Sequence, residues 1–171
     1  MLTTLSAVKT YLKIEHENND DALLSELIKA CSTAIENHCQ RKFEAETYEE
    51  EYDGSGKTFI LLQNYPVTSI SSVEVDEQVI VPSEYKVRKN NGMLFRSGVW
   101  PQGIMNVRVI YTAGLNEVPS DVELACKVFV KSFFNTDVAN FSTTFGEGFV
   151  FRADSIPAQV KMLLQPYKKV M

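Results

Sequence analysis

The sequence of 171 residues lacks the segments and residue patterns that mark several classes of protein. No apolar run approaches the roughly 20 residues that a membrane-spanning helix needs. The first residues contain no basic stretch followed by an apolar run, so we expect no signal peptide. The three cysteines, Cys31, Cys39 and Cys126, are too few and too scattered for a disulfide framework. These absences favour a cytoplasmic product without a membrane partner.

Positive charge is also scarce. Lys and Arg number 17 against 22 Asp and Glu, which gives a net charge of -5. Affinity for phosphates comes mainly from clustered Lys and Arg, so the charge argues against a free-standing nucleic-acid binder. It does not exclude a protein past which DNA slides. We find no internal repeat and no low-complexity linker.

The two ends of the chain have helical patterns. Thr3 or Thr4 can cap a short helix that places Leu5, Val8 and Leu12 on one face. After a polar break, a longer amphipathic helix is predicted to run from about residue 20 to His38. Two further helices are predicted after residue 117. One begins near Pro119 and the other near Pro157, with basic residues at the end of the second.

The middle of the chain has the pattern of short antiparallel strands. Alternating segments over about 43–114 are separated by turn signals at 53–56, 76–77 and 90–92. We interpret 53–56, Asp-Gly-Ser-Gly, as a hairpin turn, although Gly56-Lys57-Thr58 matches the end of a phosphate-binding loop. The glycine that such a loop requires is replaced by Glu51. The order of elements predicts an α+β fold, as one domain with helical parts 1–42 and 117–171 and a β-rich insertion at about 43–114.

The chain offers little for catalysis or for cofactor and metal binding. With only two histidines we find no plausible nucleophilic triad. Cys31 and His38 share a helix face, but further ligands at metal spacing are absent, and buried cysteines commonly act as small hydrophobes. We therefore expect no enzyme activity, no cofactor and no metal site.

Two clusters of similar side chains, one acidic and one aromatic, stand out in the sequence. An acidic run around Glu49, Glu50 and Glu51 most simply forms a solvated strand face. Phe141, Phe145, Phe149 and Phe151 occupy a glycine-bearing segment. All four are candidate contacts with another subunit, and the alternative for Phe145, Phe149 and Phe151 is packing as strand residues in the core of their own chain.

The order of motifs along nearly the whole chain resembles the head–tail connector family of tailed bacteriophages, in its longer β-containing form. The similar segments are Leu2-Thr3-Thr4-Leu5, Asp20-Asp21 with Leu24, Leu27 and Ile28, Tyr52-Asp53-Gly54-Ser55-Gly56, Tyr65-Pro66-Val67, Trp100-Pro101, Val109 to Gly114, Val118-Pro119 and Ile156-Pro157 with Leu163-Leu164.

The resemblance implies a structural protein of the virion, assembled in the host cytoplasm. Such a subunit forms a ring of about a dozen copies below the portal protein, extends the DNA channel and receives a stopper or tail protein. It would contact DNA without reading its sequence. The four phenylalanines then become candidate contacts with a neighbouring subunit or the portal, and Glu49, Glu50 and Glu51 candidates for facing the channel. The alternative is a tail-completion or tail-terminator ring protein.

Overall fold

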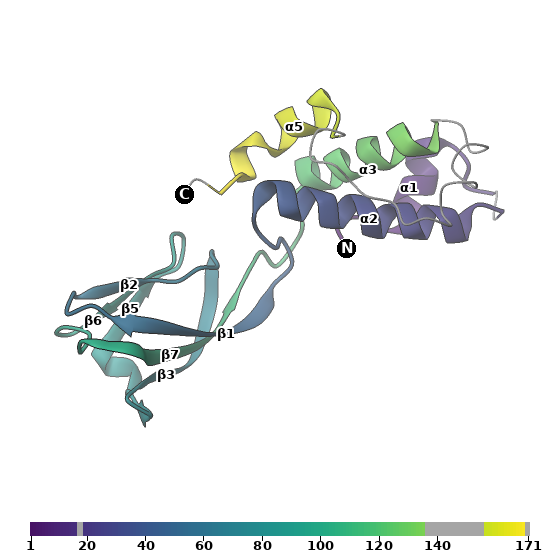
Figure 1. Cartoon of the computed structure of the whole chain (residues 1–171). Helices are drawn as coiled ribbons and strands as arrows, with labels where there is room; N and C mark the ends of the chain where they lie inside the picture. Colours follow the sequence, from purple (N-terminus) through teal and green to yellow (C-terminus); the bar gives the residue numbers. More distant parts are fainter. Residues whose placement is uncertain (17–18, 136–155, 170–171) are drawn as a thin grey trace. The chain divides into compact units, whose positions relative to one another are not determined.

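The computed structural model describes residues 1–16, 19–135 and 156–169, which fold as two compact units. The helical unit comprises Met1–Arg41 and Glu117–Met171, and the β unit comprises Lys42–Asn116. Helices precede and follow the antiparallel strands along the chain, so the predicted α+β order is confirmed (Figure 1). The prediction of one domain with an insertion stays a prediction. No helix in the described ranges is long and apolar enough to span a membrane.

The helical unit begins with two helices, α1 (Leu5–Leu12) and α2 (Asp21–Cys39). The Thr4 hydroxyl accepts a hydrogen bond from the Ala7 N–H at 3.2 Å, which confirms one of the two predicted caps of α1. The Leu2 N–H donates to Ser32 Oγ on α2 at 3.1 Å in a buried position. The first residues of the chain are therefore held against α2.

The second half of the helical unit contains α3 (Ser120–Phe134), α5 (Ala158–Leu164) and a 3-10 turn, η4 (Gln165–Tyr167). Pro119 lies just before the first turn of α3 rather than inside it. Tyr167 donates to both carboxylate oxygens of Asp121 at 2.8 and 2.9 Å, which joins η4 to the start of α3. Fully buried core side chains come from each of the described helices α1, α2, α3 and α5: Val8, Leu24, Ile35, Val122, Phe129, Val130, Val160 and Leu164.

The β unit contains two antiparallel sheets. The large sheet has the strand order β1-β7-β3-β4, made of β1 (Glu46–Gly54), β7 (Gly103–Ala113), β3 (Val67–Val75) and β4 (Gln78–Val79). The small sheet has the order β2-β6-β5, made of β2 (Phe59–Leu61), β6 (Met93–Arg96) and β5 (Tyr85–Arg88), with a 3-10 turn, η1 (Pro82–Glu84), before β5.

Both sheets contribute to one core. Ile60 and Leu94 of the small sheet cluster with Val73, Val109 and Tyr111 of the large sheet. Trp100 also belongs to this cluster and is completely buried. Because one face of each sheet packs on this core, the other two faces point outward on opposite sides of the β unit.

Two of the predicted turns are confirmed and one is wrong. Asp76 and Glu77, with φ of 49° and 65°, connect β3 to β4, and Gly92, with φ of 68°, lies in the turn between β5 and β6. Residues 53–56 are not a hairpin turn, because β1 pairs with β7 while β2 pairs with β6. This segment carries the chain from the large sheet to the small one.

The β unit begins and ends at one place. The Leu115 N–H donates to the Phe43 carbonyl at 2.9 Å, and Glu44 forms an isolated bridge with Leu115. Gly114, with φ of 128°, lies so close to this crossing that an added Cβ would be 2.4 Å from the Glu44 carbonyl oxygen. Only glycine fits there without rearrangement.

Candidate assembly surfaces

The predicted acidic residues lie on β1, where the alternation of side chains separates them. Glu49 and Glu51 are exposed, whereas Glu50 is half-buried on the side of the strand that faces the core. Successive residues of a strand point to opposite faces of its sheet. The three carboxylates that were predicted to face a channel therefore do not share one surface. For Glu49 and Glu51 the channel role stays a prediction.

Glu50 is part of a hydrogen-bonded network at the edge of the core. Its carboxylate accepts hydrogen bonds from the hydroxyls of Tyr52 and Tyr111, the latter at 2.7 Å, and from Asn64 Nδ2 at 2.8 Å. The two tyrosine oxygens in turn accept the N–H groups of Gln63 and Asn64. Burial, and secondly the hydrogen bond to Glu50, raises the pKa of both tyrosines. The network joins the 63–64 segment to β1 and β7, and we assign it a structural role.

The outer face of the large sheet is acidic. We call Glu49, Glu51, Glu74 and Arg108 the acidic face. Arg108 on β7 lies in register with Glu51 of β1 on one side and Glu74 of β3 on the other. Its guanidinium hydrogen-bonds Glu49 with Nε at 2.8 Å and lies 3.6 Å from Glu74. The hydrogen bond to Glu49, and then the surrounding carboxylates, raises the pKa of Arg108.

A hollow of about 330 Å³ opens at one end of the acidic face. Glu51, Glu74 and Arg108 line it together with Asp76 and Glu77 of the β3–β4 turn. Across the described part of the chain, no group of three or more His, Cys, Asp or Glu side chains could hold a metal ion. Because four of the five residues named in its lining are Asp or Glu, we interpret this region as a charged surface.

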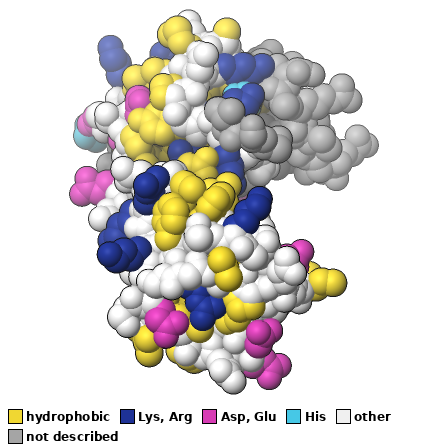
Figure 2. All heavy atoms as spheres, turned by 90° about the vertical axis from the view of Figure 1, so that its left-hand side faces the viewer, with side chains coloured by type: hydrophobic (Ala, Val, Ile, Leu, Met, Phe, Trp, Pro, Cys, Tyr) yellow, Lys and Arg dark blue, Asp and Glu magenta, His cyan; other side chains and the backbone are white. Residues whose placement is uncertain are grey.

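The outer face of the small sheet has the opposite character. We call Phe59, Leu61, Met93, Phe95, Lys86 and Arg88 the cationic-apolar face. Phe59 is paired with Phe95 and Leu61 with Met93, while Lys86 and Arg88 continue the same two rows on β5. Figure 2 shows one side of the protein, on which hydrophobic side chains gather next to Lys and Arg side chains.

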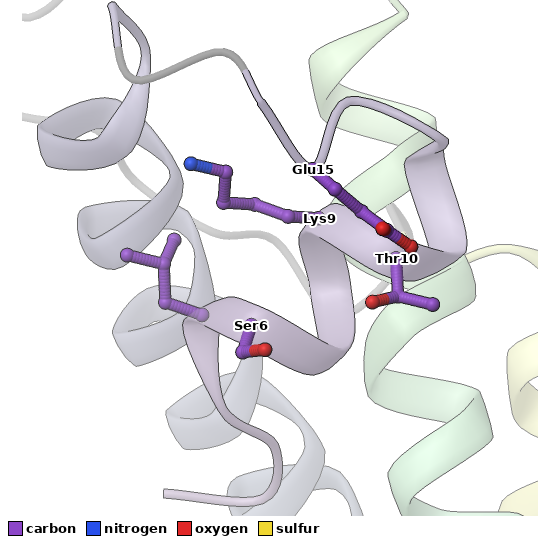
Figure 3. A pocket seen from close by; sticks show the side chains of 5 residues that line it. Ser6, Lys9, Thr10 and Glu15 are labelled. Carbon is purple, nitrogen blue, oxygen red and sulfur yellow. The ribbon is translucent and has the colours of Figure 1, made fainter.

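The helical unit has a shallow hollow along α1, with a volume of about 330 Å³ (Figure 3). Leu5, Ser6, Lys9, Thr10 and Glu15 line it. The Lys9 ammonium forms an ion pair with Asp21 at 2.8 Å, and its side chain is only 9% exposed. Because this charge already bridges α1 and the first turn of α2, we interpret the hollow as a surface feature without a chemical role.

The three cysteines are buried, and His38 lies in the last turn of α2. Cys31, Cys39 and Cys126 are buried, free thiols, and burial raises the pKa of each, to about 11 for Cys39 and Cys126. The pKa of His38 is lowered, first by burial and then by Lys168 and Lys161. Protonated thiols are weak nucleophiles and poor ligands, so these cysteines act as small core residues.

The glycine-containing segment after β1 is packed against the chain rather than open for a phosphate. Gly54 N–H donates to the Asn106 side chain at 2.8 Å, and Gly56 N–H donates to the Trp100 carbonyl at 3.0 Å. A Cβ added at Gly54 would be 1.6 Å from the Pro101 carbonyl oxygen. These N–H groups are occupied, which agrees with the rejection of a phosphate-binding loop.

One cluster that was predicted from the sequence lies outside the described residues, and one surface of the structure was not predicted. Phe141, Phe145, Phe149 and Phe151 lie outside the ranges that the structure describes. The cationic-apolar face was missed, although the alternation of Phe59-Ile60-Leu61 and of Lys86-Val87-Arg88 is visible in the sequence. What the alternation does not reveal is that β6 lies between these strands and joins them into one surface.

Known proteins similar to this chain are found by family, by sequence and by fold. The family model described as "Head completion protein" matches residues 1–170. Among curated proteins, the head completion protein of Escherichia phage T5 is 27% identical over 112 residues, which cover 64% of this chain. The match spans 64% of that relative's length, which is less than two thirds.

Solved structures with the same fold come from gene transfer agent (GTA) particles. A chain in the neck of an empty GTA particle, computed with C6 symmetry, has a TM-score of 0.69 at 14% identity, covering 98% of this chain and 89% of that one. A chain in the neck of a native GTA particle, computed with C12 symmetry, has a TM-score of 0.64 at 13% identity, covering 98% and 91%. At these identities the likeness shows a shared fold.

Proposed function

The chain belongs to the head completion protein family, and on this basis we propose that it is a structural subunit that completes the phage head at its junction with the tail. In this proposal the protein forms a ring below the portal, extends the DNA channel and provides the surface on which a stopper or tail protein docks. The observation that carries it is the family match over residues 1–170. The family agrees with the resemblance to head–tail connectors seen in the sequence.

The proposed mechanism is assembly without bond chemistry. It is supported by the packing of the β unit, where outward faces of opposite character offer two distinct surfaces for protein contact. A ring subunit needs two different faces, one for each neighbour, and the ring closes where the rotation between copies allows it. DNA would pass through the lumen without sequence-specific contact.

The segment with Phe141, Phe145, Phe149 and Phe151 belongs to this proposal as a predicted contact with a neighbouring subunit or with the portal. Its test is limited proteolysis of the free chain and of the chain bound to heads. Protection that appears only on binding would support the contact, whereas equal cleavage in both states would contradict it.

The function is tested by co-sedimentation of the full chain with purified portal rings or tail-less heads from the same genome. We expect saturable binding at about one copy per portal subunit. Binding to purified tail tubes, with none to portal rings or heads, would contradict the proposal and support a tail-completion role. In the same assay, charge-reversed variants of the β unit compete with the wild-type chain for binding to the heads.

A further inference from the structure

The β unit presents two unlike surfaces on opposite sides of one core. The acidic face and the cationic-apolar face belong to different sheets, and the inner sides of both sheets contribute to a single cluster of buried residues. A contact that joins the acidic face of one molecule to the cationic-apolar face of another would leave one of each face free. Such a contact can repeat from copy to copy.

The cationic-apolar face has the composition of a protein contact. Leu61 is 58% exposed and Phe59 is 37% exposed, and the Phe59 and Phe95 rings lie 6.1 Å apart. The Arg88 guanidinium lies 5.0 Å from the centre of the Phe95 ring. Aromatic side chains, Met and Arg are enriched in protein interfaces, and Arg over an aromatic ring combines charge with apolar area.

The acidic face complements it in charge and also carries apolar groups. Glu49, Glu51 and Glu74 surround one guanidinium, that of Arg108, so the surface keeps an excess of negative charge. Ile110 lies in register with Glu49 on the same face, and Val79 on β4, which is 69% exposed, lies in register with Glu74. Carboxylates with apolar neighbours are the counterpart that Lys86, Arg88, Phe59 and Leu61 require.

We propose that the acidic face of one copy of this chain docks on the cationic-apolar face of the next copy, so that the β units associate head to tail. The pairing itself is read from the two surfaces. Only the closure of the chain of contacts into a ring rests on the proposed function.

A second copy fits the observations better than nucleic acid does. Phosphate binding uses clustered cations, but two of the three strands of the cationic-apolar face, β2 and β6, present Phe59, Leu61, Met93 and Phe95 there. The complementary surface is present on the same chain and therefore always in equal amount. Docking of the acidic face on a second copy is an alternative to the prediction that Glu49 and Glu51 line the channel. One experiment distinguishes these two roles.

The test uses two charge-reversed variants of the full chain. Variant one carries Lys86→Glu and Arg88→Glu, and variant two carries Glu51→Lys and Glu74→Lys. Each alone brings like charges together across the contact, so we expect self-association, measured by sedimentation equilibrium at low ionic strength, to weaken about tenfold or more. An equimolar mixture of the two variants pairs opposite charges at every contact, so association should return to the wild-type level.

The control variant is Lys29→Glu, a charge reversal at an exposed position of α2 in the helical unit. It should associate like the wild type. The fluorescence of Trp100, the one tryptophan of the chain, reports for each variant whether the β-unit core remains intact. A wild-type chain that stays monomeric over the whole concentration range, or a mixture that associates no better than its components, would overturn the proposal.

Failure of this inference is distinguishable from failure of the proposed function. Variants that lose binding to heads but associate normally would show that these faces contact the head, which overturns the head-to-tail pairing and leaves the function intact. If both variants associate normally and bind heads, but variant two differs from variant one in the DNA that the heads retain, the result would support a channel-facing position for Glu51. Restored association in the mixture without any binding to heads would support the pairing and overturn the function.

Discussion

The role of a single residue in a strand of this chain depends on the face of the sheet to which its side chain points. Glu49, Glu50 and Glu51 are adjacent and identical, yet Glu50 accepts hydrogen bonds at the core while its neighbours contribute to a charged surface. The alternation could be predicted from the strand pattern. The hydrogen-bond partners of Glu50 could not, because Tyr111 and Asn64 approach only when β7 and the segment after β2 are in place.

Asn106 is a residue whose structural role is visible only in the fold. Its side-chain oxygen accepts the Gly54 N–H at 2.8 Å, and its amide donates to the Pro101 carbonyl at 3.3 Å. Replacing it by Ala leaves both backbone groups without this partner. We expect Asn106→Ala to lower the free energy of unfolding of the β unit by about 1–3 kcal/mol.

Urea unfolding followed by Trp100 fluorescence measures this change, since that side chain is buried in the β-unit core. Asn90→Ala, at an exposed position between β5 and β6, is the matched control and should leave the midpoint unchanged. An equal midpoint for Asn106→Ala and wild type would show that the two hydrogen bonds add nothing to stability.

At the scale of elements, local patterns predicted the helices and two turns, and pairing in space decided the rest. The Thr4 cap of α1 and the apolar stripes of α1 and α2 depend on residues three or four apart, which the sequence displays directly. β1 pairs with β7 and β2 pairs with β6, so each strand has a partner that comes much later in the sequence. The 53–56 segment was therefore predicted as a hairpin, because a strong turn signal does not specify which strands it joins.

The stability of the helical unit should be sensitive to alkaline pH because this unit buries the thiols of Cys39 and Cys126. The pKa of the Cys39 and Cys126 thiols is raised from 9.0 to about 11, chiefly by burial. A raised pKa means that the folded state favours the protonated thiol, so its stabilising effect is complete below about pH 9 and is lost as the pH rises through about 11. We expect the stability of the helical unit to fall across that window.

Urea unfolding followed by far-ultraviolet circular dichroism, repeated at several pH values, measures this dependence. Cys126→Ala should be less stable than wild type at neutral pH but should lose less stability on alkalinisation, because one buried thiol no longer ionises. A pH dependence as steep in Cys126→Ala as in wild type would contradict the assignment.

For the molecule as a whole, we expect the β unit to fold independently. Its core residues all lie between Lys42 and Asn116, and its two ends are joined by the hydrogen bond from Leu115 to Phe43. We expect a fragment of residues 42–116 to unfold cooperatively with Trp100 buried. Trp100 emission and amide dispersion in proton NMR spectra measure both properties.

A shorter fragment, residues 42–102, is the control for that experiment. It retains Trp100 but lacks β7, which pairs with both β1 and β3. This fragment should show exposed tryptophan emission and no cooperative transition. A 42–116 fragment that behaves like the shorter one would contradict the independence of the β unit.

The hydrogen bond between the two ends of the β unit also affects how α2 and α3 come into contact during folding. With the β unit unfolded, the contact between these helices closes a loop that contains every residue from 42 to 116, and closure entropy grows with the logarithm of loop length. Once the β unit has folded, Phe43 and Leu115 are held together by a 2.9 Å hydrogen bond, and the loop is reduced in effect to a short connection. Folding of the inserted strands should therefore accelerate docking of the helices on either side of them.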